Sequence, residues 1–189
     1  MKNVKTMLKI FMDDKQLSAW LKELLRSRDP EFCPVEKACL HAAEGMEGLE
    51  TLLDLRHRQL VSDLRFAIWQ GFKLNLENFR SPLGAAALKL DYSQLLQEHI
   101  MFSLPSHSVV QKELDLLTGA MTAEQREALE PVEAYFAYLE TVGLKVAHYL
   151  GFRLGDVLYP MVEPGYVADP AATQRCRWDL EQYIGFTLE

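Results

Sequence analysis

The sequence is poor in cysteine and contains no long apolar run. Its three cysteines, Cys33, Cys39 and Cys176, cannot all pair within one chain, so we expect reduced thiols and no disulfide scaffold. No apolar stretch approaches the roughly 20 residues that cross a bilayer. Residues 1–12 lack the long apolar centre and the small-residue cleavage site of a secretory signal. We therefore expect a cytoplasmic protein that has no membrane partner.

The short motifs of several common enzyme classes are also missing. The chain has neither a GxGxxG nor a GxxxxGK[ST] loop to hold a nucleotide, and it has no GxSxG turn to expose a nucleophilic serine. No cysteine lies in a recognisable nucleophile setting. These absences favour a non-enzymatic protein without a cofactor, and they leave a helical enzyme as the open alternative.

The charge balance is acidic. The net charge is -7, from 20 basic and 27 acidic side chains, which opposes sequence-independent binding to nucleic acid because such binding releases counterions from phosphates. Hydrophobic residues make up 49% of the chain and charged residues 25%, as in ordinary globular proteins. A chain of 189 residues fits one domain, and we expect residues 1–189 to form a single all-helical domain.

Residues 47–79 predict a long helix that is apolar on two opposite sides. One stripe comprises Leu53, Leu60, Val61, Leu64, Ile68 and Phe72, and the other comprises Leu52, Leu55, Phe66 and Trp69. A helix that is apolar on one side lies on a core, whereas a helix that is apolar on two sides lies inside it. We therefore expect an all-α bundle of about seven helices around this central helix.

Other helix boundaries follow from local signals. Thr122 with Gln125 forms the clearest capping box, and Asp169 before Pro170 marks the start of the last helix. Pro131 is expected either to kink a helix or to start a new one. Residues 153–169 are expected to form a short helical turn and a long surface loop, whereas residues 3–12 fit either a helix or a strand.

Three glycines also carry a prediction. Gly71, inside the central helix, indicates either the close approach of another helix or a bend. Gly143 lies on the apolar stripe of its own helix, which indicates that another helix crosses nearby. Gly151 is expected to end that helix as its C-cap.

Two pairs of residues are candidate ligand or metal sites beside the central helix. Asp54 with His57, and His41 with Glu44, are each three residues apart on a predicted helix, so each pair shares a helix face. Di-iron bundles place Glu-x-x-His pairs in this way, although no Glu-x-x-His occurs here. The plainer interpretation of such pairs is a solvated surface, and we favour it.

His57 falls on the line of the first apolar stripe, and Asn75 lies on nearly the same line. The interpretation that we favour is that each is a buried polar side chain with a hydrogen-bond partner. The alternative is a polar group in a pocket, in which Asp54 or a neighbouring arginine sets the charge of the imidazole.

The last helix offers candidate partner-binding residues. Trp178 lies opposite the stripe of Ala172, Cys176, Leu180 and Tyr183, between Arg175 and Arg177. Tryptophan and arginine are enriched at the energetic centres of interfaces, and Tyr166 could join such a surface. The alternative is that the preceding loop covers Trp178. Acidic residues could compose a second surface: Asp13, Asp14, Glu44, Glu47, Glu50, Glu124, Glu127, Glu130 and Glu133.

We therefore expect a non-enzymatic cytoplasmic binding protein that acts through an acidic or aromatic surface. One form of this hypothesis is an inhibitor or immunity protein that neutralises a basic partner by electrostatic complementarity. The alternative is a helical enzyme, or a protein that binds a metal or small molecule beside the central helix. A homodimer that buries Trp178 or the second stripe is a third hypothesis.

Overall fold

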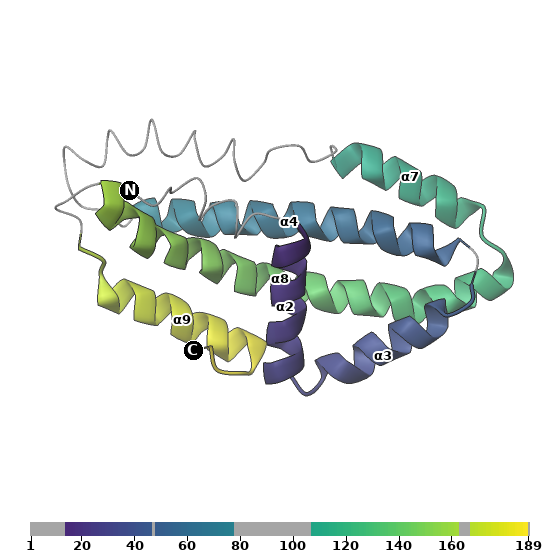
Figure 1. The fold of residues 1–189 in the computed structure, drawn as a ribbon, viewed down its shortest axis with the longest axis horizontal. Helices are drawn as coiled ribbons and strands as arrows, with labels where there is room; N and C mark the ends of the chain where they lie inside the picture. The colour runs from purple at the N-terminus through teal and green to yellow at the C-terminus, as the bar shows by residue number, and fades with distance from the viewer. Residues whose placement is uncertain (1–13, 47, 78–106, 163–166, 189) are drawn as a thin grey trace.

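The computed structural model describes residues 14–46, 48–77, 107–162 and 167–188, and all regular elements in these ranges are α-helices (Figure 1). The six helices are α2 (Asp14–Arg28), α3 (Phe32–Ala43), α4 (Leu49–Glu77), α7 (His107–Gly119), α8 (Ala123–Val162) and α9 (Pro170–Ile184). The all-α fold and the long central helix are thus confirmed. None of the described helices combines the length and the hydropathy that crossing a bilayer requires.

The two longest helices, α4 and α8, lie side by side and run in the same direction (Figure 1). Near the start of both, Arg56 forms an ion pair with Glu133 at 3.0 Å. Near the end of both, Asn75 donates a hydrogen bond to Asp156 at 3.0 Å. α7 returns along α4, α3 and α9 lie along α8, and α2 crosses the pair.

The apolar pattern of α4 largely agrees with its burial. Most members of both predicted stripes are buried, and the buried members are Leu52, Leu55, Leu60, Val61, Leu64, Ile68, Trp69 and Phe72. Phe66 was predicted to be inside, but its side chain is 49% exposed. It lies on the solvent-facing side of α4, in helical register with exposed Gln70 and Lys73.

Glycine allows α4 and α8 to touch through their backbones. A Cβ atom added to Gly71 would lie 1.8 Å from the carbonyl oxygen of His148, and one added to Gly151 would lie 1.8 Å from that of Ile68. A Cβ on Gly155 would lie 2.6 Å from the side chain of Asn75. The close approach predicted at Gly71 is therefore correct, and the backbone contact leaves no room for any other residue type there.

Gly143 confirms the second predicted crossing. A Cβ atom on it would lie 2.8 Å from Cδ2 of Leu21, which belongs to α2. Gly151, in contrast, does not end its helix, because α8 continues from Ala123 to Val162. The positive-φ glycines of the described chain, Gly45, Gly48 and Gly185, include no residue of α8, so Gly151 serves the interhelical contact.

The other signals along α8 give mixed outcomes. Pro131 neither starts a helix nor separates two, because α8 is continuous through it. α8 accommodates Pro131 although an interior proline costs a helix roughly 3 kcal/mol. α8 also continues to Val162, so the short helical turn and loop predicted for residues 153–169 are instead a continuous helix as far as Val162.

Both strong N-terminal signals are confirmed. At the start of α8, the backbone N–H of Thr122 donates to Gln125 Oε1 at 2.8 Å, and the N–H of Gln125 donates to Thr122 Oγ1 at 3.2 Å. At the start of α9, Asp169 accepts from the N–H of Ala171 at 3.0 Å. These bonds satisfy backbone donors that have no partner within a helix.

Replacing Gly71 tests the backbone contact between α4 and α8. We expect Gly71→Ala to lower the free energy of unfolding by about 3 kcal/mol or more, since the methyl group would meet main-chain atoms that cannot rotate away. Gly119→Ala is the matched control, because Gly119 is also helical and a Cβ there would meet nothing within 4 Å. The control should stay within about 1 kcal/mol of the wild type. Chemical denaturation followed by circular dichroism measures both, and equal losses would contradict the contact.

Candidate functional site

Asp54, on α4, and His41 and Glu44, at the end of α3, are exposed. Asp54 forms an ion pair with Arg58 at 2.8 Å, one helical turn away. His41 Nδ1 lies 3.9 Å from Glu44, and these two side chains are 90% and 81% exposed. Within the described ranges, no group of three or more His, Cys, Asp or Glu side chains could hold a metal ion.

His57 is half-buried on α4, as its place on the apolar stripe indicated. Loss of solvent lowers the pKa of its imidazole, the charge of nearby Lys22 lowers this pKa further, and Asp54 opposes both effects. The predicted influence of Asp54 is therefore present, but burial dominates. The uncharged imidazole is the favoured form in the folded protein.

Asn75 is buried and forms part of a hydrogen-bond network that joins three helices. Its Nδ2 group donates to the carbonyl oxygen of Phe152 at 2.7 Å and to Asp156 Oδ1 at 3.0 Å. Asp156 Oδ2 also accepts from Arg153 at 2.7 Å and from the hydroxyl of Thr173 at 2.9 Å. Asn75 thus matches the favoured interpretation of a buried, satisfied polar side chain, and Asp156 is the residue that extends the network to the surface.

The cysteines beside these helices are poor nucleophiles. Burial raises the pKa of Cys39 to about 11 and that of Cys176 to about 11. Both therefore remain thiols near neutral pH, and the reactive species of cysteine is the thiolate. Neither residue provides the chemistry of a cysteine enzyme.

In the last helix, α9, Leu180 is the only buried side chain. Trp178 points away from Leu180, as its position predicted, and its side chain is 57% exposed. Arg175 is exposed one turn earlier, whereas Arg177 turns towards α8 and pairs with Glu181 at 2.7 Å. Tyr166 lies outside the described residues. Trp178 is therefore not buried.

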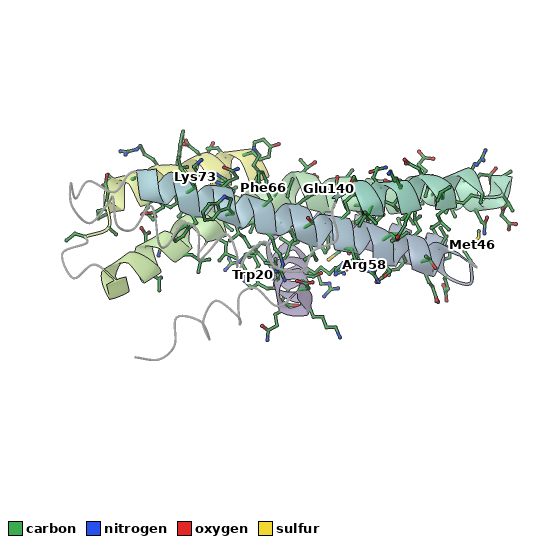
Figure 2. All side chains as sticks on the ribbon, turned by 90° about the horizontal axis from the view of Figure 1, so that it is seen from above. Trp20, Met46, Arg58, Phe66, Lys73 and Glu140 are labelled. Carbon is green, nitrogen blue, oxygen red and sulfur yellow. The ribbon has the colours of Figure 1, made fainter. Side chains whose placement is uncertain are left out.

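A second apolar surface, which we call the α4–α8–α9 face, adjoins α9 on one side. It consists of two shallow grooves of about 420 and 510 Å³ that share Lys145, His148 and Tyr183. Lys145 Nζ lies 4.7 Å from the centre of the Tyr183 ring, which is a cation–π contact. Phe66 lines one groove, and Figure 2 shows it on the same side of the molecule as Lys73 and Glu140.

The acidic side chains gather elsewhere. Exposed carboxylates cluster where α3 ends and where α4 and α8 begin, at one end of the bundle, and they are Glu44, Glu50, Glu124, Glu127 and Glu130. Two further candidates form ion pairs, Asp14 with Arg65 and Glu133 with Arg56. Asp13 and Glu47 lie outside the described residues. The acidic and aromatic surfaces are thus separate parts of the molecule.

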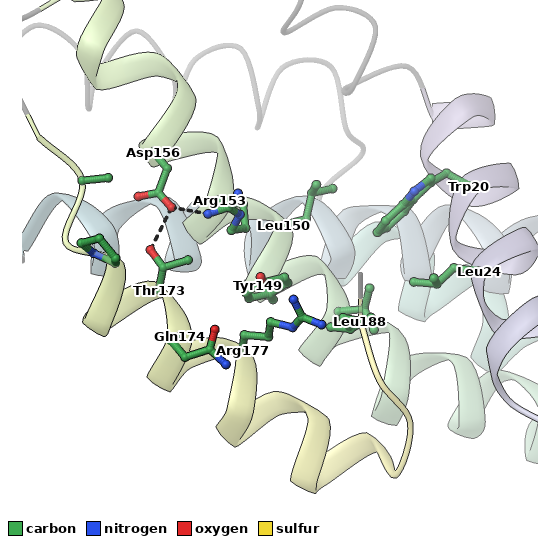
Figure 3. A pocket seen from close by; sticks show the side chains of 13 residues that line it. Trp20, Leu24, Tyr149, Leu150, Arg153, Asp156, Thr173, Gln174, Arg177 and Leu188 are labelled. Carbon is green, nitrogen blue, oxygen red and sulfur yellow. Dashed lines mark hydrogen bonds and ion pairs between the residues drawn. The ribbon is translucent and has the colours of Figure 1, made fainter.

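A cleft of about 640 Å³ lies on the other side of α9, between α9, α8 and α2. Figure 3 shows Asp156, Arg153 and Thr173 at one end of this cleft and Trp20 with Leu24 at the other. Sequence patterns gave no indication of the cleft, because its walls come from three helices far apart in the chain. Tyr183 and Lys145 were missed for the same reason.

A comparison with family models, with curated proteins and with solved structures finds no match to this chain. The functional interpretation therefore rests on the geometry of the surfaces and the cleft described above.

Asp156 should be important for stability because it accepts three hydrogen bonds while its side chain is only 9% exposed. We expect Asp156→Asn to lower the free energy of unfolding by about 2 kcal/mol, since the amide keeps one acceptor oxygen but replaces the other with an NH2 donor, which would face the donor of Asn75 or those of Arg153 and Thr173. Asp179→Asn, at an exposed position of α9, is the control and should change stability by less than about 0.5 kcal/mol. Urea denaturation measures both, and equal values for the two variants would contradict this network.

The lowered pKa of His57 predicts a pH dependence of stability. The folded protein takes up a proton at His57 less readily than the unfolded chain, whose imidazole has the ordinary pKa of 6.5. The free energy of unfolding should therefore fall as the pH decreases below about 6.5, and His57→Gln should fall less steeply between pH 7 and pH 5. Denaturation curves across this range measure both slopes. Parallel slopes for the variant and the wild type would argue that His57 is solvated.

Proposed function

We propose that this protein is a non-enzymatic binding protein that holds a partner protein against the outer side of α9. The observation that carries the proposal is the exposure of Trp178, at 57%, on a helix with a single fully buried side chain. Burying such an indole contributes more interface energy than burying most other side chains. The solvent exposure of so large an apolar group otherwise has no benefit for folding.

The neighbouring groups define the chemistry of the partner. Arg175 is exposed one turn before Trp178, so a carboxylate on the partner could pair with it at the rim of the contact. Tyr183 is 56% exposed and continues the apolar surface towards Phe66. We therefore expect a partner that presents an apolar pocket or an amphipathic segment with an acidic edge.

A different protein is favoured over a second copy of this chain. Each copy carries a net charge of -7, so two copies repel one another at long range. A homodimer through Trp178 would have to overcome this repulsion, whereas a partner with a complementary field would be attracted. The homodimer remains one outcome of the test below.

The acidic end of the bundle supports a second candidate function, inhibition or neutralisation of a basic partner. Glu124 and Glu127 are exposed in the first turns of α8, and Glu50 is exposed at the start of α4. Gln125 lies beside Gly48, which brings the starts of these two helices together. Such a contact would depend strongly on salt, whereas a contact through Trp178 would not.

Site-specific crosslinking separates these functions. A photo-crosslinking amino acid is placed at position 178, at position 127 or at Val109, which is 48% exposed on α7, on the far side of α4 from α9. We expect a discrete crosslinked protein from position 178 and none from position 109. Trp178→Ala should then weaken binding of the purified partner at least about tenfold, as for an interface hot spot.

Other outcomes change the conclusion in defined ways. A crosslink from position 127 alone, lost at high salt, would indicate that the partner binds the acidic end of the bundle and not α9. A crosslink of the chain to itself, together with a doubled mass in light scattering, would indicate the homodimer. Equal crosslinking at positions 178 and 109 would overturn the proposal.

A further inference from the structure

The cleft between α2, α8 and α9 has the size of a small-molecule site. Its volume of about 640 Å³ lies within the roughly 300–1,000 Å³ that is typical of ligand pockets. It lies on the opposite side of α9 from the α4–α8–α9 face, because Thr173 and Arg177 line the cleft and Cys176 and Tyr183 line the face.

One end of the cleft is apolar. Trp20 and Leu24 contribute the wall from α2, Leu150 contributes the floor from α8, and Leu188 closes this end (Figure 3). Trp20 remains 40% exposed although it faces other apolar groups. A ligand with an aliphatic or aromatic body would remove this surface from water.

The other end of the cleft is polar and offers mainly hydrogen-bond donors. Among the described residues that line the cleft, Asp156 is the one carboxylate, and Asn75, Arg153 and Thr173 already donate three hydrogen bonds to it. A carboxylate has about four acceptor positions, so Asp156 has little capacity left for a ligand. Arg153 donates to Asp156 through Nη1, and its guanidinium has four further N–H groups.

Gln174 adds an exposed amide to this polar end. Arg177 lies between the two ends, and its guanidinium points along the cleft towards Leu188 (Figure 3). Covering Arg153 with an apolar ligand would remove its solvation without replacing it, which is costly for a charged group. An anionic group would restore the lost interactions with charge-assisted hydrogen bonds.

From this arrangement we infer that the cleft binds a small amphipathic organic anion. The apolar body of the ligand lies against Trp20 and Leu150, and its carboxylate or similar oxyanion lies beside Arg153 and Gln174. A medium-chain carboxylate has this chemistry. Asp156 has little capacity left for a cation, because Asn75, Arg153 and Thr173 already donate hydrogen bonds to it.

Displacement of a fluorescent probe tests the ligand class. Anilinonaphthalene sulfonate combines an aromatic body with an anionic group, and sodium octanoate should displace it while neutral octanol should do so much less well. Saturable displacement by octanoate supports the site. Equal displacement by octanol, or no saturable binding of the probe, overturns the inference.

Charge changes at Gln174 locate the site without breaking any described contact. We expect Gln174→Glu to weaken octanoate binding about fivefold and Gln174→Lys to strengthen it by a similar factor, because the new charge would lie within a Debye length of the oxyanion. Gln182→Glu and Gln182→Lys are the matched controls, since Gln182 is exposed on α9 but does not line the cleft. Unchanged melting temperatures establish that all four variants fold. Equal effects at positions 174 and 182 would mean that the anion responds only to overall charge, and would overturn the assignment of the site.

Discussion

The backbone contact between α4 and α8 is the interaction on which the rest of the structure depends. Packed helices are usually separated by about 8–10 Å because side chains lie between them, whereas here Gly71 and Gly151 remove those side chains at facing positions. Each helical glycine costs about 0.5–1 kcal/mol in conformational entropy relative to alanine. Dispersion between the closely packed main chains, together with weak Cα–H to carbonyl contacts, offsets this cost. The contact also fixes the register of the two helices, because it can form only where the glycines meet.

That register determines where the charged and apolar surfaces lie. Because α4 and α8 are parallel, their starts meet at one end of the bundle, where their backbone N–H groups carry partial positive charge. Glu50 and Glu124 occupy the first turns there and suit this potential. The ends of both helices meet at the opposite side, where Asn75 and Asp156 join them and Asp156 holds α9 through Thr173. The register of α4 and α8, which their contact in the core sets, therefore places the acidic surface and the α9 surfaces in different parts of the molecule.

The sequence predicted those parts of the fold that depend on local signals or on one helix at a time. The two-sided pattern of α4, the capping box at Thr122 and the glycine crossing at Gly71 are confirmed because each signal has few physical interpretations. Gly151 was misread, since a glycine at the end of an apolar stripe fits a C-cap and a helix contact equally well. The prediction that Phe66 is buried was wrong because a helical wheel does not show which side of a helix its neighbours leave exposed to solvent. The exposure of Trp178 could be anticipated from its own helix, but the cleft could not, because Trp20, Leu150 and Gln174 meet only in the folded chain.

The ionisable groups around α9 are compatible with the recognition role proposed above. General acid–base catalysis needs a group that exchanges a proton near neutral pH. Burial raises the pKa of Cys176 to about 11 and lowers that of His148, while Arg177 lowers the pKa of Glu181 through a hydrogen bond. Cys176 is therefore a thiol near neutral pH, and thiols are poor nucleophiles. The proposed partner surface and the cleft lie on two sides of the same helix. A ligand that orders α9 at one site therefore reduces the entropic cost of binding at the other site. By linkage, the two affinities would then rise together, with α9 as the shared element.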